Sequence, residues 1–178
     1  AIAQTAYGKT GTLELRTVPR PTPGEGEVLV RVHSTGVNDQ DWALLTGVPR
    51  FVRLFNGPRG HLGRILGADV AGEVVAVGPG VTRFGRGDRV FGDLSEYGNG
   101  GFAEYLAASE KGFTRMPDSL SYVDAAALPH ALVELAPLRL LSADRLSLGV
   151  AAPARERCHD LVSVTQHELA QLGQNRRR

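Results

Sequence analysis

Short runs of alternating or β-branched hydrophobic residues, separated by glycine and proline turns, fill the first 120 positions of the chain. Residues 12–16 and 27–33 alternate in part, and the turn signal Pro23-Gly24-Glu25-Gly26 precedes the second run. Residues 67–90 follow the pattern of a strand, a glycine turn, a short link and a second strand, and residues 101–107 that of another strand. Several short strands at this spacing are typical of a barrel or a sandwich, so the pattern predicts a mainly β domain.

Glycine is concentrated in the same part of the chain. Twenty of the 22 glycines lie at or before Gly112. Within residues 67–87 they fall where a side chain would block close packing or a tight turn. The change in composition predicts that the chain after about residue 130 folds differently from the part before it.

Three segments carry helix signals. Pro49 suits the first turn of a short helix that Asn56-Gly57 would end. The Ser121 hydroxyl can accept from the amide of Asp124 and so begin a second helix, which Pro129 interrupts. Residues 161–172 have the pattern of an amphipathic helix.

Composition narrows the possible functions. The chain is 42% hydrophobic and 22% charged, as expected for a soluble globular core, and its net charge of +1 gives no general attraction to nucleic acid or anionic membranes. No apolar run could span a bilayer and no signal peptide is visible, so we expect a cytoplasmic protein with neither nucleic acid nor membrane as a partner. The single cysteine, Cys158, excludes an intrachain disulfide and a cysteine zinc site.

Motifs for other chemistries are missing from the sequence. There is no G-x-S-x-G, no H-x-x-x-H and no C-x-x-C. Cys158 and His159 are adjacent but have no partner at catalytic spacing, which favours an exposed tail pair over a nucleophile. The remaining histidines are scattered, so the sequence predicts no metal site.

Five segments, in order, resemble the medium-chain dehydrogenase/reductase family. They are Gly36-Val37-Asn38-Asp39-Gln40-Asp41-Trp42, Gly67-Ala68-Asp69-Val70-Ala71-Gly72, Phe84-Gly85-Arg86-Gly87-Asp88-Arg89-Val90-Phe91, Gly100-Gly101-Phe102-Ala103-Glu104-Tyr105 and Ala125-Ala126-Ala127-Leu128-Pro129. In this family a GroES-like β-barrel supplies part of the substrate site, and a Rossmann domain binds NAD(P). The resemblance therefore implies a GroES-like β-barrel with short helices over residues 1–129.

The resemblance also narrows the branch. Zinc alcohol dehydrogenases have Cys where this chain has Asn38, and His-Glu where it has Ala68-Asp69. Neither Asn nor Ala is a usual zinc ligand. The chain is thus similar to the zinc-free quinone oxidoreductase branch, whose members pass hydride from NADPH to a quinone or an enone.

The cofactor domain of that family has no counterpart here. A dinucleotide site needs a strand and a glycine-rich turn that opens a helix, and no such motif follows Pro129. We therefore expect residues 130–178 to be a divergent tail, helical or irregular, without a Rossmann domain. No cofactor-binding residue is assigned, and NADPH, implied by the resemblance alone, should not bind this chain tightly.

Asn38 and Asp41 are the candidate catalytic residues. The resemblance implies that they lie near the nicotinamide and the acceptor, where Asn38 could donate to a carbonyl oxygen as it gains charge. The alternative is a turn in which Asn and Asp bond their own backbone. Asp69 is expected to have a structural hydrogen-bonding role, since a lone carboxylate lacks an acid–base partner.

A second set of candidates is apolar. Trp42, Phe51 and Phe55 could form a lid over an aromatic acceptor, with Arg50 and Arg53 meeting phosphate. The alternative for residues 49–57 is a surface segment that covers the barrel.

Three functional hypotheses remain open. The first is a quinone or enone reductase by descent, truncated and inactive alone because the cofactor domain is lacking. The second is a non-catalytic GroES-like module that binds a small ligand or a partner, and the third is an inactive truncated remnant. Without its usual covering domain, the barrel face that carries Asn38 should self-associate or be covered by a second chain or the tail.

The residue types at positions 38 and 68 generate a direct prediction about zinc. Protein purified without added metal should contain far less than one zinc ion per chain, because neither Asn38 nor Ala68 ligates zinc. Elemental analysis measures this ratio. A stoichiometric ion would contradict the zinc-free assignment.

Overall fold

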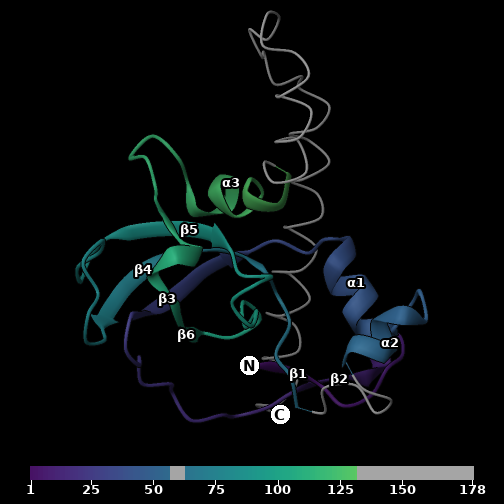
Figure 1. The fold of residues 1–178 in the computed structure, drawn as a ribbon. Helices are drawn as coiled ribbons and strands as arrows, with labels where there is room; N and C mark the ends of the chain where they lie inside the picture. The colour runs from purple at the N-terminus through teal and green to yellow at the C-terminus, as the bar shows by residue number, and fades with distance from the viewer. Residues whose placement is uncertain (57–62, 132–178) are drawn as a thin grey trace, which may run out of the picture. The chain divides into compact units, whose positions relative to one another are not determined.

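The computed structural model describes residues 1–56 and 63–131. The chain divides into two units, Ala1–His130 and Ala131–Arg178, and the description below concerns the first. Residues 132–178 of the predicted tail, including the helix expected over 161–172 and the Cys158–His159 pair, lie outside the described residues. The elements of the first unit, labelled in Figure 1, are β1 (Ile2–Gln4), η1 (Thr10–Thr12), β2 (Leu13–Leu15), β3 (Glu27–Thr35), α1 (Asp39–Thr46), α2 (Phe51–Asn56), β4 (Asp69–Val77), β5 (Arg89–Asp93), β6 (Tyr105–Ser109), η2 (Glu110–Gly112), β7 (Thr114–Arg115) and α3 (Tyr122–Ala126).

The prediction of a mainly β domain is confirmed. Five strands form one antiparallel sheet in the order β6-β3-β4-β5-β7, and β1 and β2 form a separate antiparallel pair. The hydrogen-bonded order is linear, so among the described residues the strands do not close into a complete barrel.

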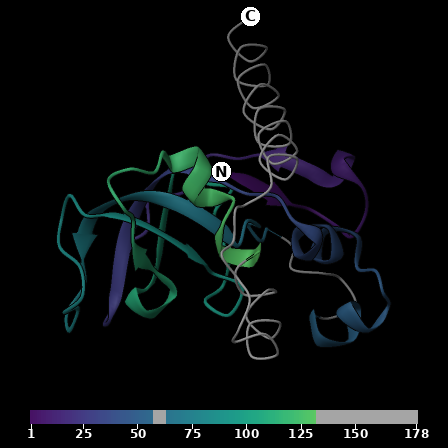
Figure 2. The ribbon, with the colours of Figure 1, turned by 90° about the horizontal axis from the view of Figure 1, so that it is seen from above.

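The larger sheet buries residues on both of its faces. One face carries the main apolar cluster, which includes Val28 and Val30 of β3 and Val70 and Val74 of β4, all fully buried. On the other face Ala71 packs with Met116 and with two alanines of α3. Figures 1 and 2 show α3 lying across β3, β4 and β5. The sheet therefore contributes residues to both apolar clusters of the domain.

Helices α1 and α2 lie beside the larger sheet in both views (Figures 1 and 2). Gly47 ends α1 in the left-handed conformation, with a φ of 65°, which glycine adopts without strain. The Arg53 guanidinium of α2 donates to the carbonyl oxygens of Thr46 and Gly47 at 3.1 Å. The short helix predicted over residues 49–57 is present, and Arg53 fastens it to the end of α1.

Two boundaries differ from the prediction. The strand expected over 101–107 enters the sheet only at Tyr105, because Gly101 and Phe102 instead donate their amides to the carbonyls of Gly67 and Leu66. Pro129 was expected to interrupt a helix, and α3 indeed ends at Ala126. Helical conformation resumes at Pro129, the position in a first turn where a missing amide costs nothing.

The Ser121 cap is confirmed at the start of α3. Its hydroxyl oxygen accepts from the Asp124 amide at 3.1 Å. The Asp124 carboxylate bonds the Ser121 hydroxyl at 2.8 Å, so the two side chains lock the first turn. In the described part of the chain, no helix is both long and apolar enough to cross a membrane.

Gly72 generates a prediction about stability. A Cβ at this position would overlap the carbonyl oxygen of Arg31 and lie 2.6 Å from Cγ1 of Val30, both on the paired strand β3. We expect Gly72→Ala to lower the free energy of unfolding by about 1–3 kcal/mol, measured by urea denaturation. Gly85→Ala is the matched control, because nothing lies within 4 Å of its Cβ. Equal stability of the two variants would contradict the packing argument.

Candidate functional site

Asn38 and Asp41 together begin helix α1. The Asn38 Oδ1 accepts from the amides of Gln40 at 3.1 Å and Asp41 at 3.4 Å, and Asp41 Oδ2 accepts in return from the Asn38 amide at 3.1 Å. This reciprocal arrangement is a capping box, which satisfies amides that the first helical turn leaves without partners. The alternative role considered for Asn38 and Asp41, in which they bond nearby backbone, is therefore observed in the form of a helix cap.

The Asp41 carboxylate also reaches a second segment. Its side chain is 3% exposed, and Oδ1 accepts from the Gly67 amide at 2.9 Å. Burial raises the pKa of Asp41, while the bonds from the Asn38 and Gly67 amides act in the opposite direction. One buried side chain thus joins the start of α1 to the turn that precedes β4.

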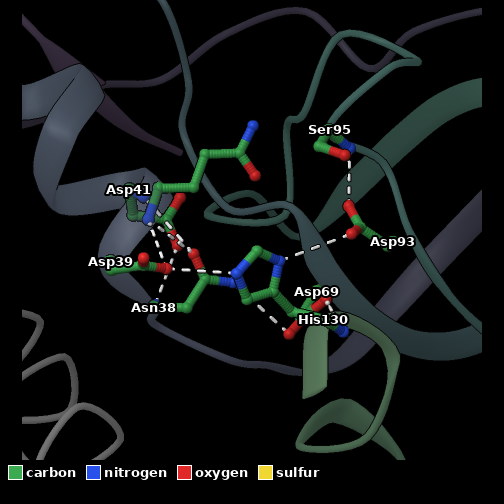
Figure 3. A network of polar contacts seen from close by, with 8 residues as sticks. Asn38, Asp39, Asp41, Asp69, Asp93, Ser95 and His130 are labelled. Atoms are coloured by element: carbon green, nitrogen blue, oxygen red, sulfur yellow. Dashed lines mark hydrogen bonds and ion pairs between the residues drawn. The ribbon is translucent and has the colours of Figure 1, made fainter. Parts of the chain in front are cut away.

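Asp69, the first residue of β4, joins Asn38 to the end of the described domain. Its Oδ2 accepts from the Asn38 Nδ2 at 3.4 Å, and its Oδ1 accepts from the backbone amide of His130 at 3.1 Å. The hydrogen-bonding role expected for Asp69 is confirmed. The premise that it is a lone carboxylate is wrong, because the fold brings Asp93 and His130 beside it (Figure 3).

The His130 ring lies between two carboxylates from different elements (Figure 3). Its Nε2 is 3.1 Å from Oδ1 of Asp39, at the start of α1, and its Nδ1 is 3.6 Å from Oδ2 of Asp93, at the end of β5. The other Asp93 oxygen accepts from the Ser95 amide at 2.8 Å. Sequence reasoning missed this cluster, since its members come from four separate segments.

The pKa values of the cluster are shifted by burial and by their mutual charges. Burial, followed by the nearby Asp93 charge, raises the pKa of Asp69 to about 6. For His130, burial lowers the pKa, but the carboxylates of Asp69, Asp39 and Asp93 together outweigh it and the net shift is upward. The surrounding carboxylates therefore stabilise the protonated form of the His130 ring.

The lid candidates lie on α1 and α2. Trp42 is 53% exposed on α1 and Phe51 is 60% exposed on α2. Phe55 also belongs to α2, but its side chain lies outside the described set. Arg53, offered as a phosphate ligand, already bonds two carbonyl groups and lies over the Tyr7 ring. These positions fit a surface segment, and the lid role stays a prediction.

The chemistry available here is polarisation and orientation. The Asn38 amide nitrogen is a neutral donor, and His130 is the one titratable cationic group of the cluster in the described chain. Within the described ranges, no group of three or more His, Cys, Asp or Glu side chains is arranged to hold a metal ion.

Comparison with known proteins gives a consistent family. The model of the alcohol dehydrogenase GroES-like domain matches residues 24–118. The chloroplast envelope quinone oxidoreductase homolog of Arabidopsis thaliana is 41% identical over 132 residues, which are 74% of this chain and 39% of that protein.

Solved structures agree with that match. The quinone oxidoreductase from Coxiella burnetii is similar with a TM-score of 0.70 at 27% identity, over 83% of this chain and 46% of that one. A mycobacterial protein solved in complex with NADPH gives a TM-score of 0.64 at 32% identity, over 85% of this chain and 41% of that one. The chain spans less than half the length of each of these relatives.

The raised pKa of Asp69 generates a prediction about pH. The folded state keeps a proton that the unfolded state releases near pH ~3.9, so this group makes stability fall as pH rises from about 4 to about 6. Asp69→Asn should remove about 1–3 kcal/mol of that fall, measured as the difference from wild type in urea unfolding at pH 4, 5, 6 and 7. The fully exposed Asp118, changed to Asn, is the control. Parallel curves for wild type and Asp69→Asn would contradict the raised pKa.

Proposed function

This chain belongs to the medium-chain dehydrogenase/reductase family, in its quinone oxidoreductase-like branch, and on that premise we propose that it forms the acceptor side of a quinone or enone reductase. In this proposal NADPH supplies the hydride, and the residues described here bind and polarise the carbonyl compound that receives it. The mycobacterial relative solved with NADPH supports the choice of cofactor.

The orientation of the Asn38 amide is the observation that carries the proposal. Two backbone amides donate to Oδ1, and only an oxygen can accept those bonds. The NH2 group is thereby directed away from the helix, and one of its two hydrogens serves Asp69. We infer that the second hydrogen donates to the acceptor oxygen as negative charge develops there.

The described residues do not fit the pyrophosphate of a dinucleotide. Such a group needs helix amides that are free of negative charge. Helix α1 carries Asp39 and Asp41 in its first turn, α3 carries Asp124, and α2 spans six residues. We therefore derive no step through the nucleotide, and we assign this domain the acceptor alone.

We propose that the Asn38 amide, and not a metal ion, polarises the acceptor carbonyl. Asn38 is bonded to helix amides and to Asp69, and Ala68 is fully buried, so neither position offers a zinc ligand. We propose a zinc-free reductase that acts in the cytoplasm.

We also propose that the side of the domain formed by α1 and α2 is covered by another polypeptide segment. Of the nine exposed large hydrophobic residues in the described chain, five lie between positions 37 and 54: Val37, Trp42, Val48, Phe51 and Leu54. Exposed apolar surface of this kind marks an interaction site. We propose that self-association or a second polypeptide segment covers it. The exposed apolar surface is the observation in favour of a binding module.

Trp42 offers a direct test of acceptor binding. It is the only tryptophan of the chain, it is half exposed, and it lies four residues after Asn38. Titration with a water-soluble benzoquinone should quench its fluorescence saturably, and Asn38→Ser should abolish saturation. Serine keeps a capping oxygen for α1 but removes the amide donor, which separates the two roles of Asn38.

The controls decide between binding and collision. Acrylamide, which quenches by collision, should act linearly and equally on both variants. Linear quenching by the quinone in the wild type, or saturable quenching that persists in Asn38→Ser, would contradict the proposed function.

A further inference from the structure

We propose that His130 is a positioning residue for Asn38: its backbone amide and its ring hold two carboxylates, Asp69 and Asp39, that orient the Asn38 amide and the start of α1. No sequence motif points to this residue. The importance of Asn38 rests on the proposed function, whereas the positioning itself is a property of the fold.

The backbone of His130 supplies the first part of the arrangement. Its amide donates to Oδ1 of Asp69, whose other oxygen accepts from the Asn38 Nδ2. Asp69 is 4% exposed, so both of its oxygens need partners within the protein. The end of the described domain thus reaches the Asn38 amide through a single carboxylate.

The ring supplies the second part. Its Nε2 lies 3.1 Å from Asp39 Oδ1, and Asp39 follows Asn38 in the chain as the first residue of α1. Its Nδ1 lies 3.6 Å from Asp93 at the end of β5. An imidazolium has two N–H donors and can serve both carboxylates, whereas the neutral ring has one and can serve only one of them.

Charge makes the arrangement depend on pH. In the described chain the acidic groups that face His130 or act on its neighbours are Asp39 and Asp41 on α1, Asp69 on β4 and Asp93 on β5. Burial lowers the His130 pKa, yet the carboxylates of Asp69, Asp39 and Asp93 raise it overall above its ordinary value. Below that pKa the charged ring holds both Asp39 and Asp93. The restraint on α1 weakens as pH rises through that pKa.

Nuclear magnetic resonance on the 178-residue chain tests this directly. We expect the side-chain NH2 resonances of Asn38 to shift with pH, at the same midpoint as the His130 ring and above ~6.5. A separate component is expected from Asp69, which accepts from the Asn38 Nδ2 and whose pKa is raised to about 6. In His130→Gln the component at the His130 midpoint should be lost, because glutamine does not titrate, and the remaining shift should follow the Asp69 carboxyl carbon. His33→Gln is the matched control, since His33 stacks on Tyr122 at a ring distance of 4.2 Å, apart from the cluster.

A second variant covers the case in which His130→Gln fails to fold. Asp39 is 81% exposed, so Asp39→Asn should fold normally while it lowers the His130 midpoint and reduces the Asn38 shift. Asn38 resonances that ignore the His130 titration, or that in His130→Gln keep a pH dependence which does not follow the Asp69 carboxyl, would overturn the proposal. The result is independent of the quinone titration, so failure of one proposal leaves the other to its own test.

Discussion

The two hydrogen bonds accepted by the Asp41 carboxylate from different segments set the geometry of the whole site. A carboxylate removed from water must be fully hydrogen-bonded, and Asp41 meets this need with the Asn38 amide on one oxygen and the Gly67 amide on the other. The start of α1 and the turn before β4 therefore cannot separate without leaving a buried charge unpaired. Asn38 and Asp69, one on each side of this junction, are held at bonding distance as a result.

Residues in or directly after three of the five family motifs meet at this junction. Asn38 lies in the first motif, Asp69 in the second, and His130 directly after the last. Asn38 follows the end of β3, Asp69 begins β4 and Asp93 ends β5, and the antiparallel pairing of β3 with β4 and of β4 with β5 brings these three strand ends together. Asp69, Asp93 and His130 therefore come together at this end of the sheet.

The sheet could be predicted from the sequence because its signals are local. The β-branched runs of β3 and β4, with glycines where backbones approach, predict strands almost to their observed ends. The α1 helix had a local signal too, since Asn38 and Asp41 have capping-box spacing, but the same residues also fit a turn. The His130 cluster had none: 61 positions separate His130 from Asp69 and 91 separate it from Asp39, and only the folded sheet relates them.

The joint between α1 and α2 separates fixed side chains from exposed ones. Arg53 donates to two carbonyl oxygens at the end of α1 and lies over the Tyr7 ring. A side chain at Gly47 would collide with both Arg53 and Tyr7. The two helices and the N-terminal segment should therefore move as one rigid body. Exposed side chains beside the joint, such as Val48 and Phe51, take no part in these contacts and can be substituted without opening it. A fixed contact between two helices and an exposed apolar surface therefore lie next to each other in the chain.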